Sequence, residues 1–171
     1  MLKYSVIQGG NMVKFIDNPC EKEKIASLVL NSLPDWFGLP ESTAKYISDC
    51  RELPFWAYFS EACPQGFIAL KQTGEVTAEI YVMGVLPQIH RHGIGTALWN
   101  AFLQYAEKNG YEYVQVKTVQ SGHYKGYDVT NKFYKSLGFC ELECLPALWG
   151  AENPCQIYIK YIPINRADGG M

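Results

Sequence analysis

The sequence predicts an α/β fold, or an α+β arrangement with a mixed sheet, and three patterns along the chain point to it. Two segments near residues 21–30 and 42–50 carry apolar side chains at helical spacing. Several short apolar stretches separated by turn residues follow from residue 54 onward and predict a run of strands. The clearest amphipathic helix of the chain then lies between two predicted strands. Early helices, a meander of strands and one strand–helix–strand unit together favour this class.

The first half of the chain predicts two helices followed by three strands, after one short initial strand. Ile25, Leu28 and Val29 give the first helix its apolar periodicity. Prolines and a glycine within residues 33–40 predict a loop before the second helix. Two short apolar strands on either side of Cys63-Pro64 are expected to pair as a hairpin. The expected helices are Glu21–Leu30 and Ser42–Cys50, and the expected strands are Met12–Ile16, Phe55–Phe59, Gly66–Lys71 and Val76–Val85.

The second half begins with the best-defined helix, which starts at Ile94. Ala97, Leu98, Ala101 and Phe102 follow the i, i+3, i+4, i+7 spacing of one helical face. Asn109-Gly110 ends this helix, because glycine readily adopts the left-handed conformation that closes a helix. The remaining expected elements are the strand Tyr113–Thr118, a helix Thr130–Leu137 that ends at Gly138, and the strands Phe139–Leu145 and Gln156–Ile162.

Length and composition indicate one domain of 171 residues, with an N-terminal extension over 1–10 and a loose tail over 166–171. A net charge of -2 argues against nucleic-acid binding, which usually requires a basic face. We find no apolar run long enough for a membrane span and no signal-peptide pattern. The six cysteines lack the paired spacing of a zinc site, so no metal is expected. A cytoplasmic protein with reduced cysteines is expected, either a monomer or a homodimer.

A glycine-rich turn between an apolar strand and a helix predicts an anion-binding site. Gly84 interrupts the strand, where a glycine often marks a bulge or a close backbone approach. Gly93 and Gly95 open the following helix, whose free N–H groups and dipole favour an anion. His90, Arg91 and His92 add a basic rim, so the outline is that of a pyrophosphate cradle. Thr96-Ala97 after the last glycine excludes a P-loop, and a dinucleotide fingerprint lacks its third glycine.

Two motifs resemble those of one family. The stretch from Val85 to Leu98, VLPQIHRHGIGTAL, is similar to the acetyl-CoA motif Gln/Arg-x-x-Gly-x-Gly/Ala of the GCN5-related N-acetyltransferase (GNAT) superfamily. His90 occupies its Gln/Arg position, which is a departure. Residues 133–139, FYKSLGF, resemble the second signature, Phe-Tyr-x-x-x-Gly-Phe. The resemblance covers roughly residues 54–161 and is that of a small bacterial-type member.

The resemblance implies a GNAT-like fold, in which helices flank a mostly antiparallel central sheet with one splayed parallel strand pair. It also implies acetyl-CoA as co-substrate, with its pantetheine arm pairing with backbone near Met83 and Val85. The pyrophosphate would be held by Arg91 to Thr96. The residues expected to bind coenzyme are Met83, Gly84, Val85, His90, Arg91, His92, Gly93, Ile94, Gly95, Thr96 and Asn131.

The same resemblance implies two proton-handling residues. Glu79 matches the glutamate base of the histone-acetylating branch and would deprotonate the acceptor amine, directly or through water. Tyr134 matches the second-signature tyrosine and would protonate the departing thiolate. Glu79 could instead be a hydrogen-bonded or surface carboxylate, and Tyr134 a packed helix residue. Tyr127 stands where the family often has an asparagine, so Asn131 is assigned to binding only as the nearest asparagine, and His123 is an alternative base.

The acceptor side is expected near Asp35, Trp36 and Phe37, whose carboxylate and rings suit a cationic amine. Trp149 is a further candidate, and Trp36 and Phe37 could alternatively anchor their loop to the core. We expect an N-acetyltransferase that moves an acetyl group from acetyl-CoA to a primary amine by direct attack in a ternary complex. A small-molecule acceptor is favoured over a protein lysine or N-terminus. Two other classes remain open, a non-catalytic acyl-CoA-binding module and another type of nucleotide-binding enzyme.

Overall fold

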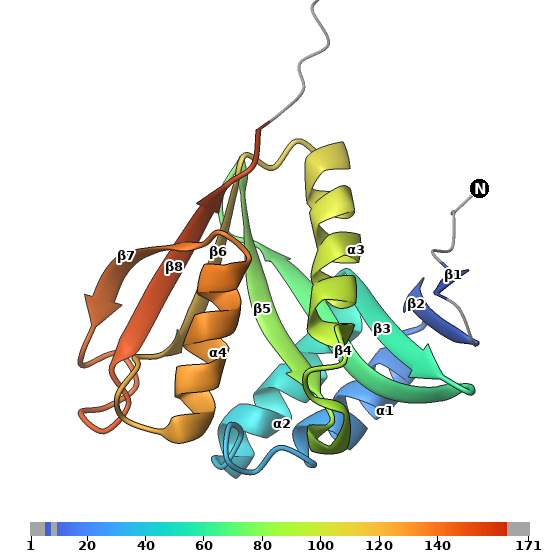
Figure 1. The fold of residues 1–171 in the computed structure, drawn as a ribbon, viewed down its shortest axis with the longest axis horizontal. Coiled ribbons are helices and arrows are strands. Elements are labelled where there is room, and N and C mark those ends of the chain that lie inside the picture. Colours follow the sequence, from blue (N-terminus) through green and yellow to red (C-terminus); the bar gives the residue numbers. More distant parts are fainter. Residues whose placement is uncertain (1–5, 8–9, 164–171) are drawn as a thin grey trace, which may run out of the picture. The chain divides into compact units, whose positions relative to one another are not determined.

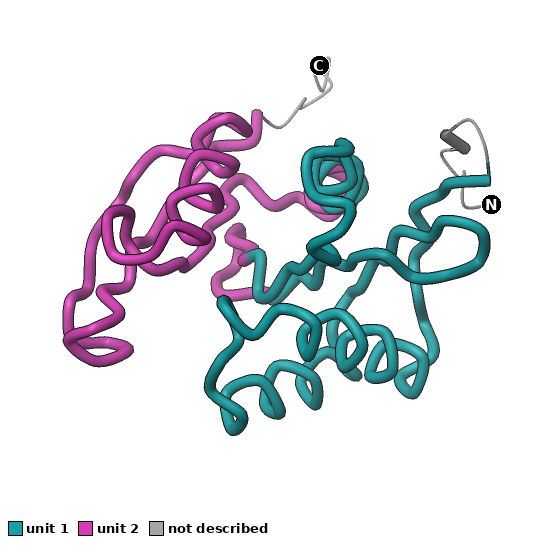
Figure 2. The backbone as a smooth tube through the Cα atoms, turned by 60° about the horizontal axis from the view of Figure 1, so that its bottom comes forward, with its two compact units in different colours: residues 1–71, 80–102 teal, residues 72–79, 103–171 magenta. Residues whose placement is uncertain are grey.

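The computed structural model describes Val6–Ile7 and Gly10–Pro163 and divides the chain into two compact units (Figures 1 and 2). The first unit comprises residues 1–71 and 80–102, and the second comprises 72–79 and 103–171. The division runs through two strands and one helix, and it leaves only Gln72, the last residue of one strand, in the second unit. The expected tail 166–171 lies outside the described residues, and the single domain expected from the chain length stays a prediction.

The first unit contains a sheet in the order β1-β2-β3-β4-β5. Antiparallel pairing joins β1 to β2, β2 to β3 and β3 to β4. Two helices, a short 3₁₀ helix and the beginning of a third α-helix complete this unit. The strands are β1 (Val6–Ile7), β2 (Asn11–Phe15), β3 (Phe55–Ser60), β4 (Cys63–Gln72) and β5 (Thr77–Val85), and the helices are α1 (Pro19–Leu30), α2 (Pro40–Asp49), η1 (Cys50–Glu52), η2 (Pro87–Ile89) and α3 (Ile94–Lys108).

The second unit has the strand order β5-β6-β8-β7, in which only the first residues of β5 take part. β6 (Tyr113–Val119) pairs antiparallel with β8 (Cys155–Tyr161), and β7 (Cys140–Leu145) pairs antiparallel with β8. α4 (Lys125–Ser136) lies between β6 and β7 in the chain. β5 and β6 form the parallel pair of the sheet, and α3 supplies the long connection that such a pair needs. The expected α/β class with a mixed sheet is confirmed.

Local sequence explains where the first two helices begin. The Asn18 side chain accepts hydrogen bonds from the backbone N–H groups of Cys20 (2.9 Å) and Glu21 (3.0 Å) and so caps α1. Pro19 occupies the first turn, where its missing N–H costs nothing. α2 also begins with a proline, Pro40. Both helices therefore start two residues earlier than periodicity alone predicts, because a proline in the first turn adds no apolar periodicity.

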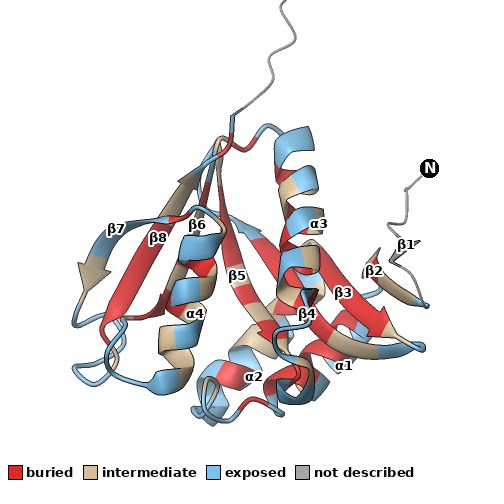
Figure 3. Ribbon diagram, in the orientation of Figure 1, coloured by how far each residue is buried: buried red, intermediate tan, exposed pale blue. Residues whose placement is uncertain are grey.

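The core of the first unit packs both faces of β3. Phe55, Ala57 and Phe59 belong to a cluster that includes α1 residues Ala26 and Val29. The alternate β3 residue Trp56 instead contacts Phe102 of α3, with ring centroids 6.1 Å apart. A strand buried on both sides is expected to read as a continuous apolar run, as FWAYF does. Figure 3 shows the resulting continuous burial along β3.

Three sequence expectations require correction. Leu28, expected on the apolar face of α1, is 49% exposed. The β3–β4 hairpin exists, but its turn is Glu61-Ala62, both with positive φ, and Cys63 and Pro64 belong to β4. Such a two-residue turn usually carries asparagine or glycine, so nothing in Glu-Ala pointed to it. α4 begins at Lys125 rather than at Thr130, since Gly126 in its first turn obscured the helical pattern.

Gly84 of β5 is required by the packing of α1. A Cβ at this position would lie 2.8 Å from Cγ1 of Val29 and 3.1 Å from Cδ1 of Leu33. On the neighbouring strand, a Cβ on Gly66 would lie 2.8 Å from the Gly84 carbonyl oxygen. The sequence suggested either a bulge or a close backbone approach at Gly84, and the structure shows the close approach. It lets α1 and β4 pack against the end of β5.

Replacing Gly84 by alanine is expected to lower the free energy of unfolding by about 1–3 kcal/mol, because the added methyl overpacks this contact. Chemical denaturation of the variant would measure the loss. Gly74→Ala is the matched control, since its Cβ would meet only ordinary contacts beginning at 3.5 Å. Truncating Val29 to alanine in the Gly84→Ala background should recover part of the loss. Equal stability of the two glycine variants would contradict this account.

Candidate functional site

In the first unit, the turn between β5 and α3 has the backbone that the glycine pattern predicts. Gly93 has a φ of 75°, and its carbonyl accepts the first helical bond of α3 from the N–H of Ala97 at 3.0 Å. Gly93 is therefore the N-cap, and the N–H groups of the first turn have no partner within the helix. A Cβ added to Gly93 would meet nothing within 4 Å, so there is open space beside this backbone. A phosphate oxygen can approach such a turn closely.

Arg91 holds a strained conformation in the same turn. Its φ is 65°, a left-handed value that costs a residue with a side chain about 1–3 kcal/mol. His90, Arg91, His92 and Gly93 are exposed, so the basic rim faces solvent. Strain at an exposed basic turn is typical of ligand-binding segments. The turn combines a helix N-terminus, a free glycine backbone and cationic side chains.

His90, which departs from the Gln/Arg of the motif, has two defined contacts. Its Nε2 lies 2.7 Å from the carbonyl oxygen of Val85, the last residue of β5. Its ring also contacts Trp36 edge-on, with centroids 5.9 Å apart. His90 thus links the end of β5 to the loop before α2. Met83 and Val85 are half-buried, and Gly84 between them is buried.

The loop expected to contact the acceptor is anchored rather than free. The Thr43 hydroxyl donates to the carbonyl oxygens of Phe37 and Leu39, each at 3.0 Å. Trp36 and Phe37 pack partly against the core of the first unit, while Asp35 is exposed. The anchoring role weighed for the two aromatic residues is therefore present in the structure. Their role in substrate binding stays a prediction.

A cluster beside this loop was not predicted as a unit from sequence. The Tyr81 hydroxyl on β5 donates a hydrogen bond to Asp49 Oδ2 at the end of α2. Lys45 Nζ reaches the same oxygen at 2.8 Å. These hydrogen bonds from Lys45 and Tyr81 lower the pKa of Asp49. Burial, followed by the bond to Asp49, raises the pKa of Tyr81 above its usual value. A helix-terminal aspartate in contact with a strand tyrosine 32 residues later leaves no local pattern in the sequence.

In the second unit, Glu79 is buried and ion-paired. Only 7% of this residue is exposed, and its Oε1 lies 2.7 Å from Nζ of Lys117 on β6. Lys117 is more open, with 30% of its side chain exposed. A buried carboxylate requires such a partner, because an unpaired charge away from water is costly. Of the readings open at this position, the surface-facing carboxylate is excluded. Lys117 was not singled out from sequence.

Tyr134 lies on α4 and is buried, with 6% of the residue exposed. Its ring contacts Phe139 and Tyr158, at centroid distances of 5.8 and 6.3 Å. Burial, followed by the charge of Tyr127, raises the pKa of the Tyr134 phenol. The hydroxyl therefore keeps its proton through the neutral range, as a general acid must before it acts. The same burial is equally compatible with a packing role.

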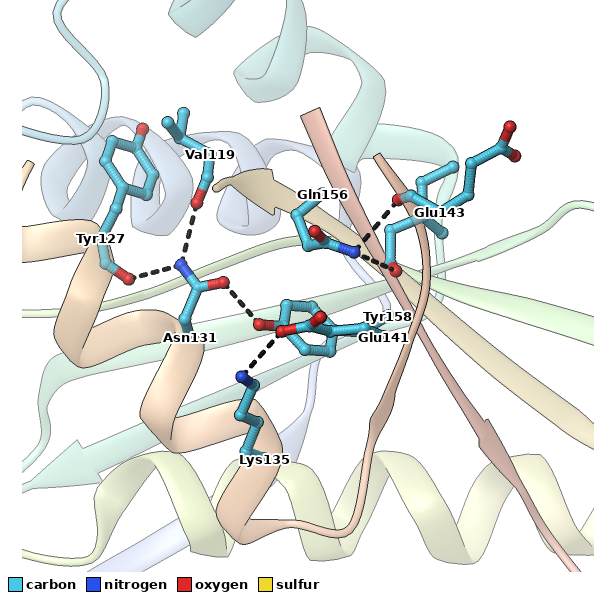
Figure 4. Close-up of polar contacts among 9 residues, drawn as sticks. Val119, Tyr127, Asn131, Lys135, Glu141, Glu143, Gln156 and Tyr158 are labelled. Carbon is cyan, nitrogen blue, oxygen red and sulfur yellow. Dashed lines mark hydrogen bonds and ion pairs between the residues drawn. The ribbon is translucent and has the colours of Figure 1, made fainter. Parts of the chain in front are cut away.

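Asn131 uses its side-chain amide inside the protein (Figure 4). Nδ2 donates to the carbonyl oxygens of Tyr127 (2.7 Å) and Val119 (2.8 Å), and Oδ1 accepts from the Tyr158 hydroxyl (2.6 Å). Both donor hydrogens are thereby used. Asn131 holds α4 against β6 and β8 and retains only acceptor capacity for any coenzyme contact.

The other candidates of the second unit are less enclosed. Trp149 lies in the β7–β8 connection and is 38% exposed, and His123 is exposed before α4. All six cysteines are free. Burial raises the pKa of Cys50 to about 12 and that of Cys155 to about 11, so both thiols stay protonated at neutral pH. The described residues contain no group of three or more His, Cys, Asp or Glu side chains arranged to hold a metal. Nor does any helix in the described part of the chain have the length and apolarity to cross a membrane.

Solved structures with the same fold have low sequence identity to this chain. Ard1 from Thermoplasma volcanium matches with a TM-score of 0.73 and 21% identity over 90% of this chain and 99% of its own. The ribosomal-protein-S18-alanine N-acetyltransferase from Escherichia coli matches with a TM-score of 0.72 and 18% identity, over 94% of this chain and 99% of its own. An aminoglycoside 6'-N-acetyltransferase complexed with coenzyme A matches with a TM-score of 0.70 and 20% identity, over 88% of this chain and 97% of its own. At these identities the likeness establishes the fold.

The family assignment comes from the sequence comparison. A search of curated proteins finds no match. A model of the acetyltransferase (GNAT) family matches residues 23–139, which is well over half of the chain and includes both motifs singled out above. The chain therefore belongs to the acetyltransferase (GNAT) family.

Proposed function

We propose that this protein transfers the acetyl group of acetyl-CoA to a primary amine of a small molecule, by direct attack in a ternary complex. The observation that carries the proposal is the exposed turn at the start of α3, where Gly93 leaves open backbone beside a helix N-terminus. Family membership supports the reaction class, and a relative of the same fold is known in complex with coenzyme A.

The residues of the turn fit the coenzyme's pyrophosphate. Acetyl-CoA supplies an acyl group activated as a thioester. The backbone N–H groups of Ile94, Gly95 and Thr96 would donate hydrogen bonds to the phosphate oxygens. The helix dipole would add to this attraction. Arg91 adds a full positive charge at the same turn. The backbone of the turn already has open space beside it at Gly93, so a phosphate can approach its N–H groups.

Two side chains would move protons. An alkylammonium has a pKa near 10.4, so the acceptor must lose a proton before its nitrogen can form a bond to carbon. Glu79, held by Lys117, is the proposed acceptor of that proton. As the C–N bond forms, the nitrogen loses its second proton to solvent. As the C–S bond breaks, the departing sulfur takes the proton that the Tyr134 hydroxyl would donate, and solvent then returns a proton to the tyrosinate. The Val85 N–H at the end of β5 is the proposed donor to the developing oxyanion.

Direct transfer also agrees with the chemistry of the buried thiols. A covalent route would require a cysteine thiolate, and the raised pKa values of Cys50 and Cys155 disfavour one at either position. The proposed route therefore uses Glu79 as a base and no enzyme nucleophile.

The proposal predicts that Glu79→Gln and Tyr134→Phe each lower kcat by about 100-fold or more with the best amine substrate. Release of free thiol from acetyl-CoA, measured across a panel of amines, gives the rates. Glu75→Gln and Tyr113→Phe are matched controls, because both residues are exposed and Tyr113 lies on β6. If acetyl-CoA binds but no amine or peptide is acetylated, the protein is a binding module and the proposal is wrong.

The coenzyme turn can be tested with two glycines at opposite ends of α3. Gly93 and Gly110 have φ values of 75° and 79°, and a Cβ on either would meet nothing within 4 Å. Alanine at each position should cost a similar amount of stability, about 1–2 kcal/mol. Only Gly93→Ala is expected to raise the KM for acetyl-CoA, by about tenfold, because only there would the methyl meet a phosphate. A KM that rises equally in both variants would remove the turn from the coenzyme site.

A further inference from the structure

Asp49 occupies a position that helix energetics disfavour. It is the last residue of α2, where the helix dipole presents its negative end and an anion is destabilising. The last turn of α2 contains no basic residue to offset it. Within the helix, the i,i+4 pair with Lys45 offsets only part of this cost. Local rules are most often broken in this way where a side chain has a function.

The surroundings of Asp49 suit an organic cation. Tyr81 donates its hydroxyl to the carboxylate, and the Tyr81 ring meets that of Tyr46 edge-on at 5.2 Å. Tyr46 in turn meets Phe37 at 6.0 Å. The carboxylate side chain is 31% exposed and so is reachable from solvent. Carboxylates combined with aromatic rings are the usual protein groups that bind alkylammonium ions.

An ammonium group already lies at this position. Lys45 Nζ is 2.8 Å from Asp49 Oδ2, and its side chain is 71% exposed. A lysine four residues before an aspartate is the weaker order for such a helical pair. Exposed pairs of this kind contribute only a few tenths of a kcal/mol, so a ligand can displace the lysine at little cost. A second cation, Lys71 Nζ, lies 5.0 Å from the centre of the Tyr81 ring.

We propose that Asp49, together with Tyr81 and Tyr46, binds a second ammonium group of the acceptor, so that the substrate is an aliphatic diamine or polyamine. The inference rests on the proposed function and specifies its substrate class. The reacting nitrogen must give up its proton, whereas the group at Asp49 keeps its charge and only anchors the chain.

The groups around the Asp49 carboxylate determine the pH range in which it is negatively charged and can bind a cation. The charges of Lys45 and Lys71 both help to lower the pKa of Asp49, and burial raises the pKa of Tyr81, so the Tyr81 hydroxyl stays protonated at physiological pH. Because hydrogen bonds from Lys45 and Tyr81 lower the pKa of Asp49, its negative charge persists well below neutral pH. The anchor is therefore available across the whole range in which an amine is a substrate.

The test is calorimetric binding of 1,5-diaminopentane and of 1-aminopentane to the full protein saturated with coenzyme A. Asp49→Asn should weaken binding of the diamine by at least about tenfold and leave the monoamine unchanged. Lys45→Met should tighten binding of the diamine by about twofold, because a competing cation is removed. Glu41→Gln, an exposed carboxylate of the same helix, is the matched control and should change neither.

Opposite effects of the two variants cannot result from loss of structure, since both break the same ion pair. If Asp49→Asn and Lys45→Met leave diamine affinity at the wild-type value, or if the diamine does not bind, the inference is overturned. Amine acetylation would then still support the proposed function. If the opposite shifts occur but no amine is acetylated, the cation site is supported while the proposed function fails.

Discussion

Close packing at the end of β5 is the constraint on which the first unit depends. Two glycines permit it: Gly84 leaves room for the Val29 side chain of α1, and Gly66 lies close to the Gly84 carbonyl on the adjacent strand. The next residue, Val85, contacts His90 through its carbonyl oxygen. His90 meets Trp36, and the left-handed residues Arg91 and Gly93 follow in the chain. The turn proposed to bind the coenzyme thus begins directly after this packed end of β5.

The second unit handles polarity differently, by pairing the buried side chains of Glu79 and Asn131. Glu79 has Lys117, and the Asn131 amide has two carbonyls and a phenol. Unpaired, each of these groups would cost several kcal/mol to bury. The first unit contributes backbone donors and exposed cations, whereas the second contributes enclosed side chains that are held by hydrogen bonds. The binding and proton-transfer roles proposed for this chain therefore draw on different kinds of local structure.

Local patterns account for most of the fold that sequence could predict. The spacing from Ile94 to Phe102 predicted α3, and Gly93 and Gly95 predicted an open helix start, because both signals lie within one turn. The β3–β4 hairpin was predicted, but its Glu61-Ala62 turn was placed too late in the chain, since neither residue favours a left-handed conformation. Partners distant in the chain were also missed. In the sequence, Lys117 is 38 residues away from its partner Glu79, and Asp49 is 32 residues away from its partner Tyr81. Tertiary pairing between single polar residues leaves no periodicity, so only the structure reveals it.

The ion pair of Glu79 and Lys117 bears on how a base in this position would recover after each cycle. At rest the two charges cancel, so the buried pair carries no net charge. Lys117 Nζ lies 2.7 Å from Glu79 Oε1, and 30% of the lysine side chain is exposed, whereas only 9% of the glutamate side chain is. The lysine is therefore the link between the enclosed carboxylate and solvent. A proton taken up at Glu79 would have a path outward along this hydrogen bond before the next amine arrives.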